Sequence, residues 1–208
     1  MSNKSGNIYG LTILSPVRRH DVGELSNALR IRQYLATLDR NTGSPFAKVS
    51  STHLARLVVL DDVVYVGMPA VEDHLKSHYL VFESNFDGDL DAYLERLAKE
   101  AAHEVNEVWK HCEGFPGTKD LDAFKKYMKK CQVPTTFFFA AVNNKTVGET
   151  LKALQVKNAF AAFVDENQGK SPEELQKAFA RFWNDLRPAP APPPGSPEIP
   201  PKVKGVPA

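Results

Sequence analysis

The chain has 208 residues, of which 42% are hydrophobic and 25% charged, the usual balance of a globular protein with one domain and an appendage. Its formal net charge of +1 excludes a global field that would attract nucleic acid or an anionic membrane. No stretch approaches the roughly 18 apolar residues of a membrane span, and the N-terminus lacks the apolar segment of a signal peptide. The two cysteines are too few for a disulfide framework. We therefore expect a cytoplasmic protein with no membrane span and no nucleic-acid partner.

The first half of the chain predicts strands and helices in the order strand, helix, strand, strand, helix. The predicted elements are a strand at residues 8–17, a helix from the capping-box spacing Asp21-Val-Gly-Glu24 to about Leu38, a strand at 52–60 with an extension through 63–66, a strand at 78–83 and a helix from 90 to 108. The apolar residues Leu25, Ala28 and Leu29 are expected on the inward face of the first helix. A turn is expected at Asn85-Phe-Asp-Gly88.

Residues 107–113 are predicted to form a short fourth strand. The order is then βαββαβ, which is the ferredoxin-like arrangement of an antiparallel sheet. A helix at 121–130 follows, and the run Thr135-Thr-Phe-Phe-Phe-Ala140 predicts a buried fifth strand at 134–142. The fold class is therefore α+β, a ferredoxin-like sheet extended by a fifth strand and extra helices.

The C-terminal third predicts two helices and a tail. Thr146-Val-Gly-Glu149 is a second capping box, and Ser171-Pro-Glu-Glu174 combines an N-cap with a proline at the first helical position. Nine of the fifteen prolines follow Arg187, and proline fixes φ and lacks the amide donor. We expect one domain over 8–186 and a disordered proline-rich tail over 187–208, either unstructured or a docking arm for a partner or a second subunit.

The candidate catalytic residues are His53, His111 and Glu113. On strands of period two, His53 would lie on one face of its strand, and Trp109, His111 and Glu113 would share one face of the fourth strand. If both sets share the sheet face that the helices leave open, a histidine and a carboxylate would meet there for acid–base catalysis. The alternative is that these residues are partly buried polar side chains at strand ends.

Arg56 and Asn85, with Asp87 and Trp109, are the candidate ligand-binding residues. Arg56 cannot lose its charge, so inside a sheet layer it needs a partner, either a carboxylate (Glu83, Asp61 or Asp87) or the acidic group of a ligand. Asn85 and Asp87 belong to the expected turn, where backbone amides could cradle an anion at a helix start. Asp and Gly are also the ordinary residues of any such turn.

No metal site is predicted. His74 and His78 have zinc-ligand spacing, but the spacing falls on a loop and a strand start. Cys112 and His111 are neighbours on the expected strand and would point to opposite faces. His103, on the expected helix, is the one candidate for a haem ligand, and its position opposite the apolar stripe favours a solvated side chain instead. The cofactor is otherwise left open.

Four segments carry a resemblance to a known group of proteins: Thr52-His-Leu-Ala-Arg56, Phe82-Glu-Ser-Asn-Phe-Asp-Gly-Asp-Leu90, His111-Cys-Glu-Gly-Phe-Pro116 and Thr135-Thr-Phe-Phe-Phe-Ala140. Together they resemble a group of uncharacterised bacterial proteins with a ferredoxin-like, dimeric α/β-barrel character, over about residues 8–165. The resemblance implies a homodimer. It implies no particular activity, and activities of fold relatives such as haem peroxidases would be analogy only.

Three functions compete at this point. The first is a binding protein or enzyme for a small, largely apolar ligand in a pocket over the open sheet face. The second is a haem-dependent, peroxidase-like oxidoreductase. The third is a non-catalytic assembly subunit that docks through its proline-rich tail.

Overall fold

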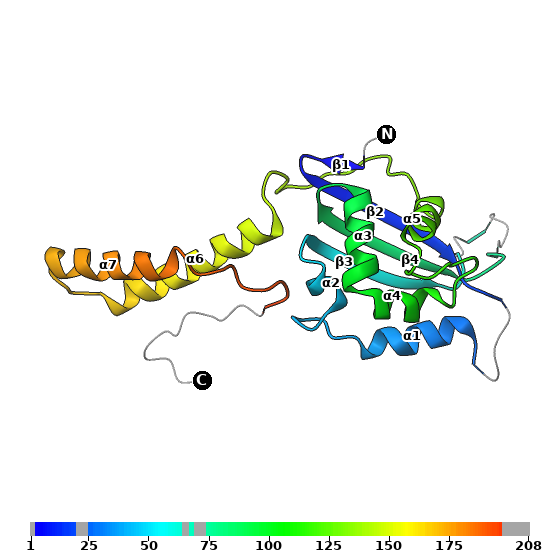
Figure 1. The fold of residues 1–208 in the computed structure, drawn as a ribbon, viewed down its shortest axis with the longest axis horizontal. Coiled ribbons are helices and arrows are strands. Elements are labelled where there is room, and N and C mark those ends of the chain that lie inside the picture. The colour runs from blue at the N-terminus through cyan, green and yellow to red at the C-terminus, as the bar shows by residue number, and fades with distance from the viewer. Residues whose placement is uncertain (1–2, 20–24, 64–66, 69–73, 197–208) are drawn as a thin grey trace.

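The computed structural model describes residues 3–19, 25–63, 67–68 and 74–196, which form one antiparallel sheet and a set of helices (Figure 1). The strands are β1 (Lys4–Ser5), β2 (Ile8–Pro16), β3 (Thr52–Leu60) and β4 (Tyr79–Asp87), and the helices are α1 (Asn27–Thr37), α2 (Pro45–Lys48), α3 (Leu90–Glu100), α4 (Ala102–Trp109), α5 (Leu121–Lys130), α6 (Val147–Glu166) and α7 (Pro172–Leu186). The predicted α+β class is confirmed. None of the described helices is both long enough and apolar enough to cross a membrane.

The sheet has the strand order β1-β2-β4-β3, and every neighbouring pair is antiparallel. The predicted strands at 8–17 and 52–60 are confirmed as β2 and β3. The third strand is longer than predicted, because β4 continues through the residues expected to form a turn and pairs with β2 as far as Asp87–Ile8. The turn begins at Gly88, whose φ of 91° lies in the left-handed region that glycine adopts without strain.

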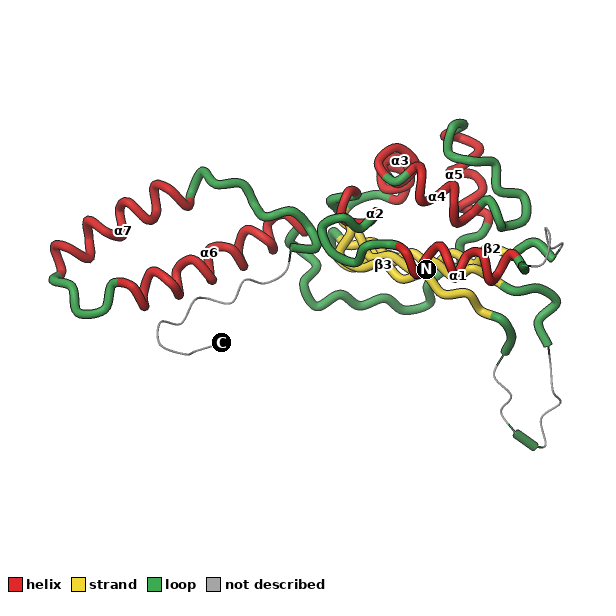
Figure 2. The backbone as a smooth tube through the Cα atoms, turned by 90° about the horizontal axis from the view of Figure 1, so that it is seen from below, coloured by secondary structure: helices red, strands yellow, loops and turns green. Residues whose placement is uncertain are grey.

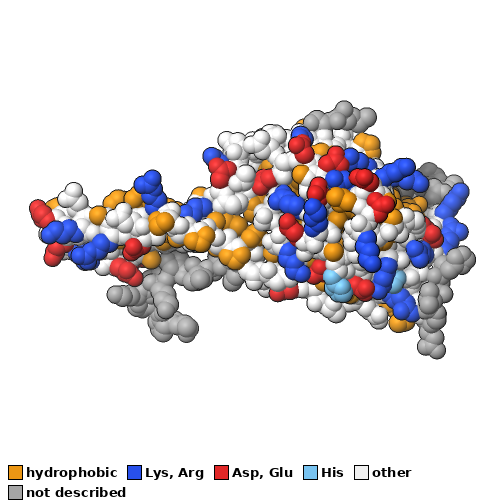
Figure 3. All heavy atoms as spheres, viewed as in Figure 1, with side chains coloured by type: hydrophobic (Ala, Val, Ile, Leu, Met, Phe, Trp, Pro, Cys, Tyr) orange, Lys and Arg blue, Asp and Glu red, His pale blue; other side chains and the backbone are white. Residues whose placement is uncertain are grey.

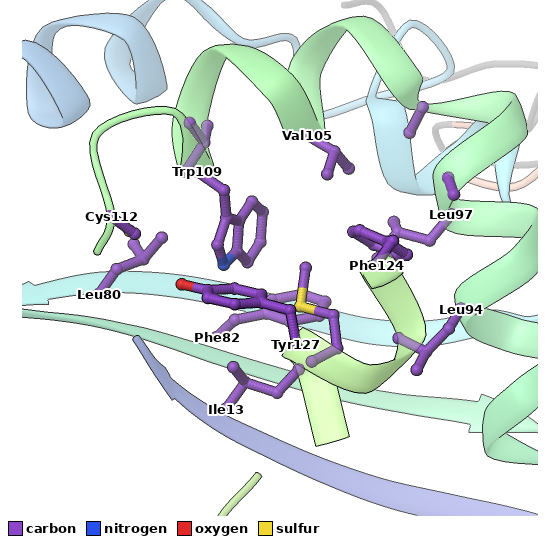
Figure 4. Close-up of a cluster of buried hydrophobic side chains, with 14 of the residues drawn as sticks. Ile13, Leu80, Phe82, Leu94, Leu97, Val105, Trp109, Cys112, Phe124 and Tyr127 are labelled. Carbon is purple, nitrogen blue, oxygen red and sulfur yellow. The ribbon is translucent and has the colours of Figure 1, made fainter. Parts of the chain in front are cut away.

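Helices α3, α4 and α5 cover one face of the sheet (Figure 2). The core between them is built from aromatic rings, because alternate residues of β4 point toward the helices. The ring of Phe86 stacks on Tyr93 with centroids 3.7 Å apart, and the fully buried Phe82 meets Trp109 edge-on at 5.5 Å. Figure 4 shows Trp109, Phe82 and Tyr127 facing one another in this core.

The predicted strand at 107–113 is wrong. Residues 107–109 complete α4, which follows α3 after a break at Ala101. Val105, Val108 and Trp109 recur at helical spacing and are all buried, so the helical period determines the structure of this segment. Among the described residues, the end of the segment pairs with the sheet region through a single bridge, from Cys112 to Val17.

The predicted fifth strand at 134–142 is also wrong. Residues 133–145, here called the crossing segment, form an irregular chain that passes over the sheet face opposite α3–α5 (Figure 2). Its backbone amides form individual hydrogen bonds and not the regular ladder of a strand. Val133 N donates to the Thr12 carbonyl (2.9 Å), and Ala140 N donates to Ser5 Oγ (3.3 Å). The ring of Phe138 lies on Gly10, where a Cβ atom would come within 2.8 Å of it.

Helix α1 begins at Asn27, where Ser26 Oγ accepts the Leu29 amide as an N-cap. The capping box predicted at residues 21–24 lies outside the described residues. Ala28 is buried as expected, but Leu25 lies before the helix and Leu29 is exposed. Ile31 is the other buried apolar residue of this helix.

Helices α6 and α7 form a hairpin that projects away from the sheet (Figure 1). Both predicted capping boxes are present, at Thr146–Glu149 and at Ser171–Glu174. The helices meet through phenylalanine rings, with Phe163 and Phe182 at a centroid distance of 4.8 Å. Helix α7 nevertheless has no buried residue. Hydrophobic side chains follow both helices on the visible surface of the hairpin (Figure 3).

The first part of the proline-rich tail, residues 187–196, returns from the hairpin toward the sheet (Figure 1). Lys152 Nζ donates to the carbonyls of Leu186 (2.8 Å) and Ala189 (2.6 Å), which holds the start of this segment on α6. Gly195 packs so closely on the backbone of Asn41 that a Cβ atom would lie 2.7 Å from it. Residues 197–208 of the predicted tail lie outside the described residues.

Candidate functional site

The sheet face opposite the helices carries the polar side chains that the sequence placed near a pocket. On β3 this face presents Leu54, Arg56 and Val58, and on β4 it presents Glu83, Asn85 and Asp87, because residues on these strands alternate between the two faces. The crossing segment covers β1 and β2 but leaves much of β3 open, and Leu54 is 67% exposed. The open face is therefore only half covered.

A cavity of about 580 Å³ lies between the crossing segment and strands β3 and β4. Its wall combines apolar groups (Leu54, Phe137, Phe138) with polar ones (Thr12, Arg56, Glu83, Asn85). Mostly apolar walls with a few polar groups are typical of small-molecule sites, and the volume falls in their usual range. The structure thus brings the predicted ligand-binding residues Arg56 and Asn85 into one cavity.

Arg56 makes an ion pair with Glu83, its direct partner across β3 and β4. The Arg56 Nε atom donates to Glu83 Oε2 at 2.7 Å, and an Nη atom donates to the same oxygen. The Arg56 side chain is 71% exposed, so it is not the desolvated charge that the sequence suggested. An exposed pair of this kind contributes little to stability, and the guanidinium remains accessible to an acidic ligand from the cavity.

His53 lies at the irregular start of β3, where the register with β4 shifts between Thr52 and Leu54. Its Nε2 atom donates to Asp87 Oδ1 at 2.8 Å. The other oxygen of Asp87 accepts the backbone amide of Val147 (2.9 Å), the first residue of α6. Asp87 therefore joins three elements, β3, β4 and α6, and its contacts are those of a structural link.

The predicted meeting of His53 with His111 and Glu113 is not found. His111 follows α4 at the opposite edge of the molecule, where its Nδ1 atom donates to Asn27 Oδ1 on α1 (2.8 Å). Glu113 is exposed, and its backbone amide donates to the Pro16 carbonyl (2.8 Å). The cause is the helical path of residues 107–109, which removes the strand alternation on which the prediction rested.

Trp109, predicted to bind the ligand, belongs to the core on the helix-covered side. It is 2% exposed, and its indole N–H donates to Ser15 Oγ at 3.2 Å. The indole also meets Phe82 edge-on (Figure 4). The sheet lies between Trp109 and the cavity of the open face, so this residue does not line that cavity.

A buried hydroxyl cluster beneath β3 and β4 was missed by sequence reasoning. Tyr93 on α3 shares a hydrogen bond of 2.8 Å with Ser84 Oγ, and Thr52 Oγ1 donates to the Tyr93 hydroxyl at 3.5 Å. Burial raises the pKa of Tyr93 above its ordinary value, so this phenol stays protonated. A serine inside an apolar strand was the only signal, and it indicates a structural hydrogen bond.

The remaining candidate groups form neither a nucleophilic site nor a metal site among the described residues. Cys112 is fully buried, and burial raises its pKa to about 12, so the thiol is not a nucleophile. His74 and His78 pair with Asp62 and Asp61, respectively. Across the described residues, no group of three or more His, Cys, Asp or Glu side chains is placed to hold a metal ion.

His103 does not fit the role of a haem ligand. It is exposed on α4, and its ring lies edge-on to Tyr34 of α1 with centroids 6.5 Å apart. His103 does not line the cavity between the crossing segment and strands β3 and β4. The geometry therefore gives the haem alternative no support.

A larger hollow of about 710 Å³ adjoins the cavity around the free edge of β3. It is bounded by α1, α2 and β3, and Pro194 and Gly195 of the returning segment close one end of it. Arg56 and Leu54 line both spaces, whereas His53 lines only this one. Of the two predicted polar determinants on β3, only Arg56 therefore borders both spaces.

The fold and the site define a class: an α+β protein with a half-open antiparallel sheet, a cavity under an aromatic crossing segment and a projecting helical hairpin. Comparison with known proteins adds no narrower identity. No family model, no curated protein and no solved structure matches the chain.

Proposed function

We propose that this protein binds a small, largely apolar molecule carrying an acidic group, held over the open sheet face. The observation that carries the proposal is the cavity of about 580 Å³ between the crossing segment and β3–β4, in which phenylalanine and leucine side chains surround the exposed guanidinium of Arg56 and its partner Glu83, which an acidic ligand would have to displace. Such walls bury the apolar body of a ligand, while arginine binds a carboxylate through two parallel hydrogen bonds. Because His53 and His111 lie far apart, the proposal is binding and includes no acid–base step.

We also propose that a second copy of the chain covers this face, in a homodimer of ferredoxin-like type. Phe137 and Phe139 of the crossing segment are 83% and 71% exposed, and Phe137 shares the wall of the cavity with Leu54. Monomers rarely expose so many large apolar groups together, and a two-fold axis lets one patch cover its own copy. The bacterial origin and cytoplasmic location expected from the sequence stay predictions.

The binding test uses octanoate and octanol, which share an apolar chain and differ in the acidic group. Isothermal titration should give tighter binding of octanoate to the wild-type chain, and Arg56→Met should abolish this preference while still binding octanol. Lys99→Gln is the matched control, because it removes a cation paired on the surface of α3. Equal octanoate binding by the Arg56→Met variant would contradict the proposal. So would the absence of any binding to the wild type.

A second candidate function is assembly through the hairpin, whereas the sequence suggested the proline-rich tail as one possible docking element. Phe160, Phe179 and Trp183 are 42–47% exposed although their rings contact one another or their neighbours. Two helices cannot enclose their own apolar side, whereas two copies of a hairpin enclose it as a four-helix bundle. The hairpin projects clear of the sheet, which leaves room for that second copy.

Light scattering on two double variants separates the two interfaces. If the sheet face holds the dimer, Phe137→Ser with Phe139→Ser gives monomers, and Phe179→Ser with Trp183→Ser stays dimeric. If the hairpin holds it, the outcome is the reverse. A wild-type chain that is monomeric at high concentration would end both assembly proposals.

A further inference from the structure

Strand β3 is the last strand of the sheet, and part of its outer edge has backbone groups without a partner among the described residues. On an antiparallel strand, successive residues direct their N–H and C=O groups alternately toward the neighbouring strand and away from it. The Val59 carbonyl points away from β4, because it accepts the guanidinium of Arg32 on α1 at 3.1 Å. Ala55 and Leu57 alternate in step with Val59, so their N–H and C=O groups also point outward.

The unpaired part of the edge opens into the hollow of about 710 Å³ between α1, α2 and β3. Ala55 and Leu57 line this hollow, and its other walls include the apolar side chains of Leu35 and Phe46. Helix α1 already occupies the edge at Val59, so the space beside β3 suits one short extended segment better than the full edge of a second sheet. An open strand edge of this kind binds an extended peptide by adding it to the ladder.

The charged side chains in the wall do not select an ionic ligand. Arg32 and Arg56 are each paired with a carboxylate that lies outside the hollow. The other arginine and aspartate side chains of the wall, Arg40 and Asp39, carry one charge of each sign. The distinctive feature of the hollow is therefore its row of backbone donors and acceptors, which an extended peptide satisfies.

The chain's own returning segment reaches this hollow. Pro194 and Gly195 close one end of it, and Gly195 rests on the backbone of Asn41. Ser196 is the last described residue, and the chain continues from it for twelve more. Five extended residues span up to about 17 Å. Residues from 202 onward can therefore reach the unpaired groups of β3, which line the same hollow as Gly195.

Residues 197–208 lie outside the described residues, but their sequence limits which of them can extend a sheet. A strand added to an edge must donate backbone amides, and proline has none to donate. After Arg187, the prolines leave a single run longer than two residues, Lys202-Val-Lys-Gly-Val206. This run contains two valines, which favour extended structure.

We infer that residues 202–206 add to the edge of β3 as a short strand within the same molecule. Their ladder partners are the N–H and C=O groups of Ala55 and Leu57, and the prolines before them form the link from Ser196. The added strand closes the hollow and covers an apolar edge that would otherwise be open to pairing with other chains. This inference does not rest on the function proposed for the open face.

The test is hydrogen exchange of the full chain, followed by NMR at single amides. The Ala55 and Leu57 amides should exchange about tenfold more slowly in the wild type than in Val203→Pro, which removes a donor from the run. Ile199→Pro is the matched control, because it adds a proline outside the run and should exchange like the wild type. The alternate amides of β3, which face β4, should exchange equally in all three chains.

Three results would overturn the inference. The first is equal exchange of the Ala55 and Leu57 amides in the wild type and in Val203→Pro. The second is the same loss of protection in Ile199→Pro, which would show that the run itself is not responsible. The third is protection that rises when the protein concentration is raised about tenfold, because a second copy and not the chain's own residues would then cover β3.

Discussion

The sheet region (β1–β4 with α1–α5) and the hairpin (α6 and α7) use the same aromatic residues with opposite results. In the sheet region Phe82, Phe86 and Tyr93 are fully buried, because a sheet face and three helices enclose them. In the hairpin the phenylalanine rings touch each other and remain partly exposed, because only two helices are present. Contact between rings is therefore not equivalent to burial, and only burial gives a large hydrophobic stabilisation.

The largest expected difference comes from removing one ring from each region. Phe82→Ala should cost about 3–5 kcal/mol of unfolding free energy, because it leaves a cavity against Phe46 and Trp109. Phe179→Ala should cost about 1 kcal/mol, because its ring is already partly in water.

Tryptophan fluorescence can report on the unfolding of each region separately, because Trp109 lies in the sheet region and Trp183 in the hairpin. Urea unfolding of the wild type and of Trp183→Phe, followed by fluorescence, separates the two signals. A hairpin that opens first shows its transition at lower urea. Coincident transitions, with equal losses for both ring variants, would remove the distinction and support the prediction of one cooperative domain over 8–186.

The next effect concerns a hydroxyl in the buried core. Tyr93→Phe should cost about 1–2 kcal/mol, because Ser84 and Thr52 lose a hydrogen-bond partner in a buried site. Tyr127→Phe is the matched control, since its buried hydroxyl faces Ser15 and Cys131 without a well-formed hydrogen bond, and its removal should cost less. Thermal unfolding of the two variants measures the difference, and equal losses would mean that the cluster is not a specific contact.

A smaller effect is expected where the hairpin holds the returning segment. Lys152→Met removes the donor to the Leu186 and Ala189 carbonyls and should cost about 1 kcal/mol locally, with little change in global stability. Hydrogen exchange over residues 187–196 should rise in this variant, whereas Lys157→Met on the same helix should leave it unchanged. Unaltered exchange in Lys152→Met would show that the hydrogen bonds of Lys152 do not hold residues 187–196 in place.

The smallest effect is a dependence of stability on pH. The pKa of His111 is lowered in the folded state, so the unfolded chain binds its proton more readily, and stability is lost as the pH falls below about 6.5. His111→Gln should remove that part of the loss. The urea midpoints of the wild type and of His111→Gln, measured at about pH 7.5 and about pH 5.5, test this prediction. An equal fall of the midpoint in both chains would contradict the assignment of the effect to His111.

Local signals in the sequence predicted much of this fold. The capping boxes at Thr146 and Ser171 and the strand at 52–60 depend on neighbouring residues, and all three are present. For the short segment 107–113 the sequence pattern could not distinguish a strand from a helix. In the structure residues 107–109 are helical, and this places Trp109 in the core on the helix-covered side of the sheet. The phenylalanine run at 137–139 has strong β propensity. It nevertheless packs across β1 and Gly10 and does not form the hydrogen-bond ladder of a strand.

The candidate site was predictable only in part. Glu83 was among the three partners expected for Arg56, because direct neighbours on paired strands are close. The separation of His53 and His111 could not be foreseen, since it depends on which end of the sheet each element reaches. The cavity itself depends on the path of the crossing segment, which no local pattern specifies.

The return of residues 187–196 from the hairpin has a practical consequence for anyone attaching a probe. The last described residue, Ser196, follows a glycine that rests on Asn41, so the chain is anchored beside the sheet and not at the hairpin tip. A dye placed at position 196 would report on the surroundings of β3. With a second dye near Gly169, at the bend between α6 and α7, a movement of the hairpin relative to the sheet would change the efficiency of energy transfer between the two dyes.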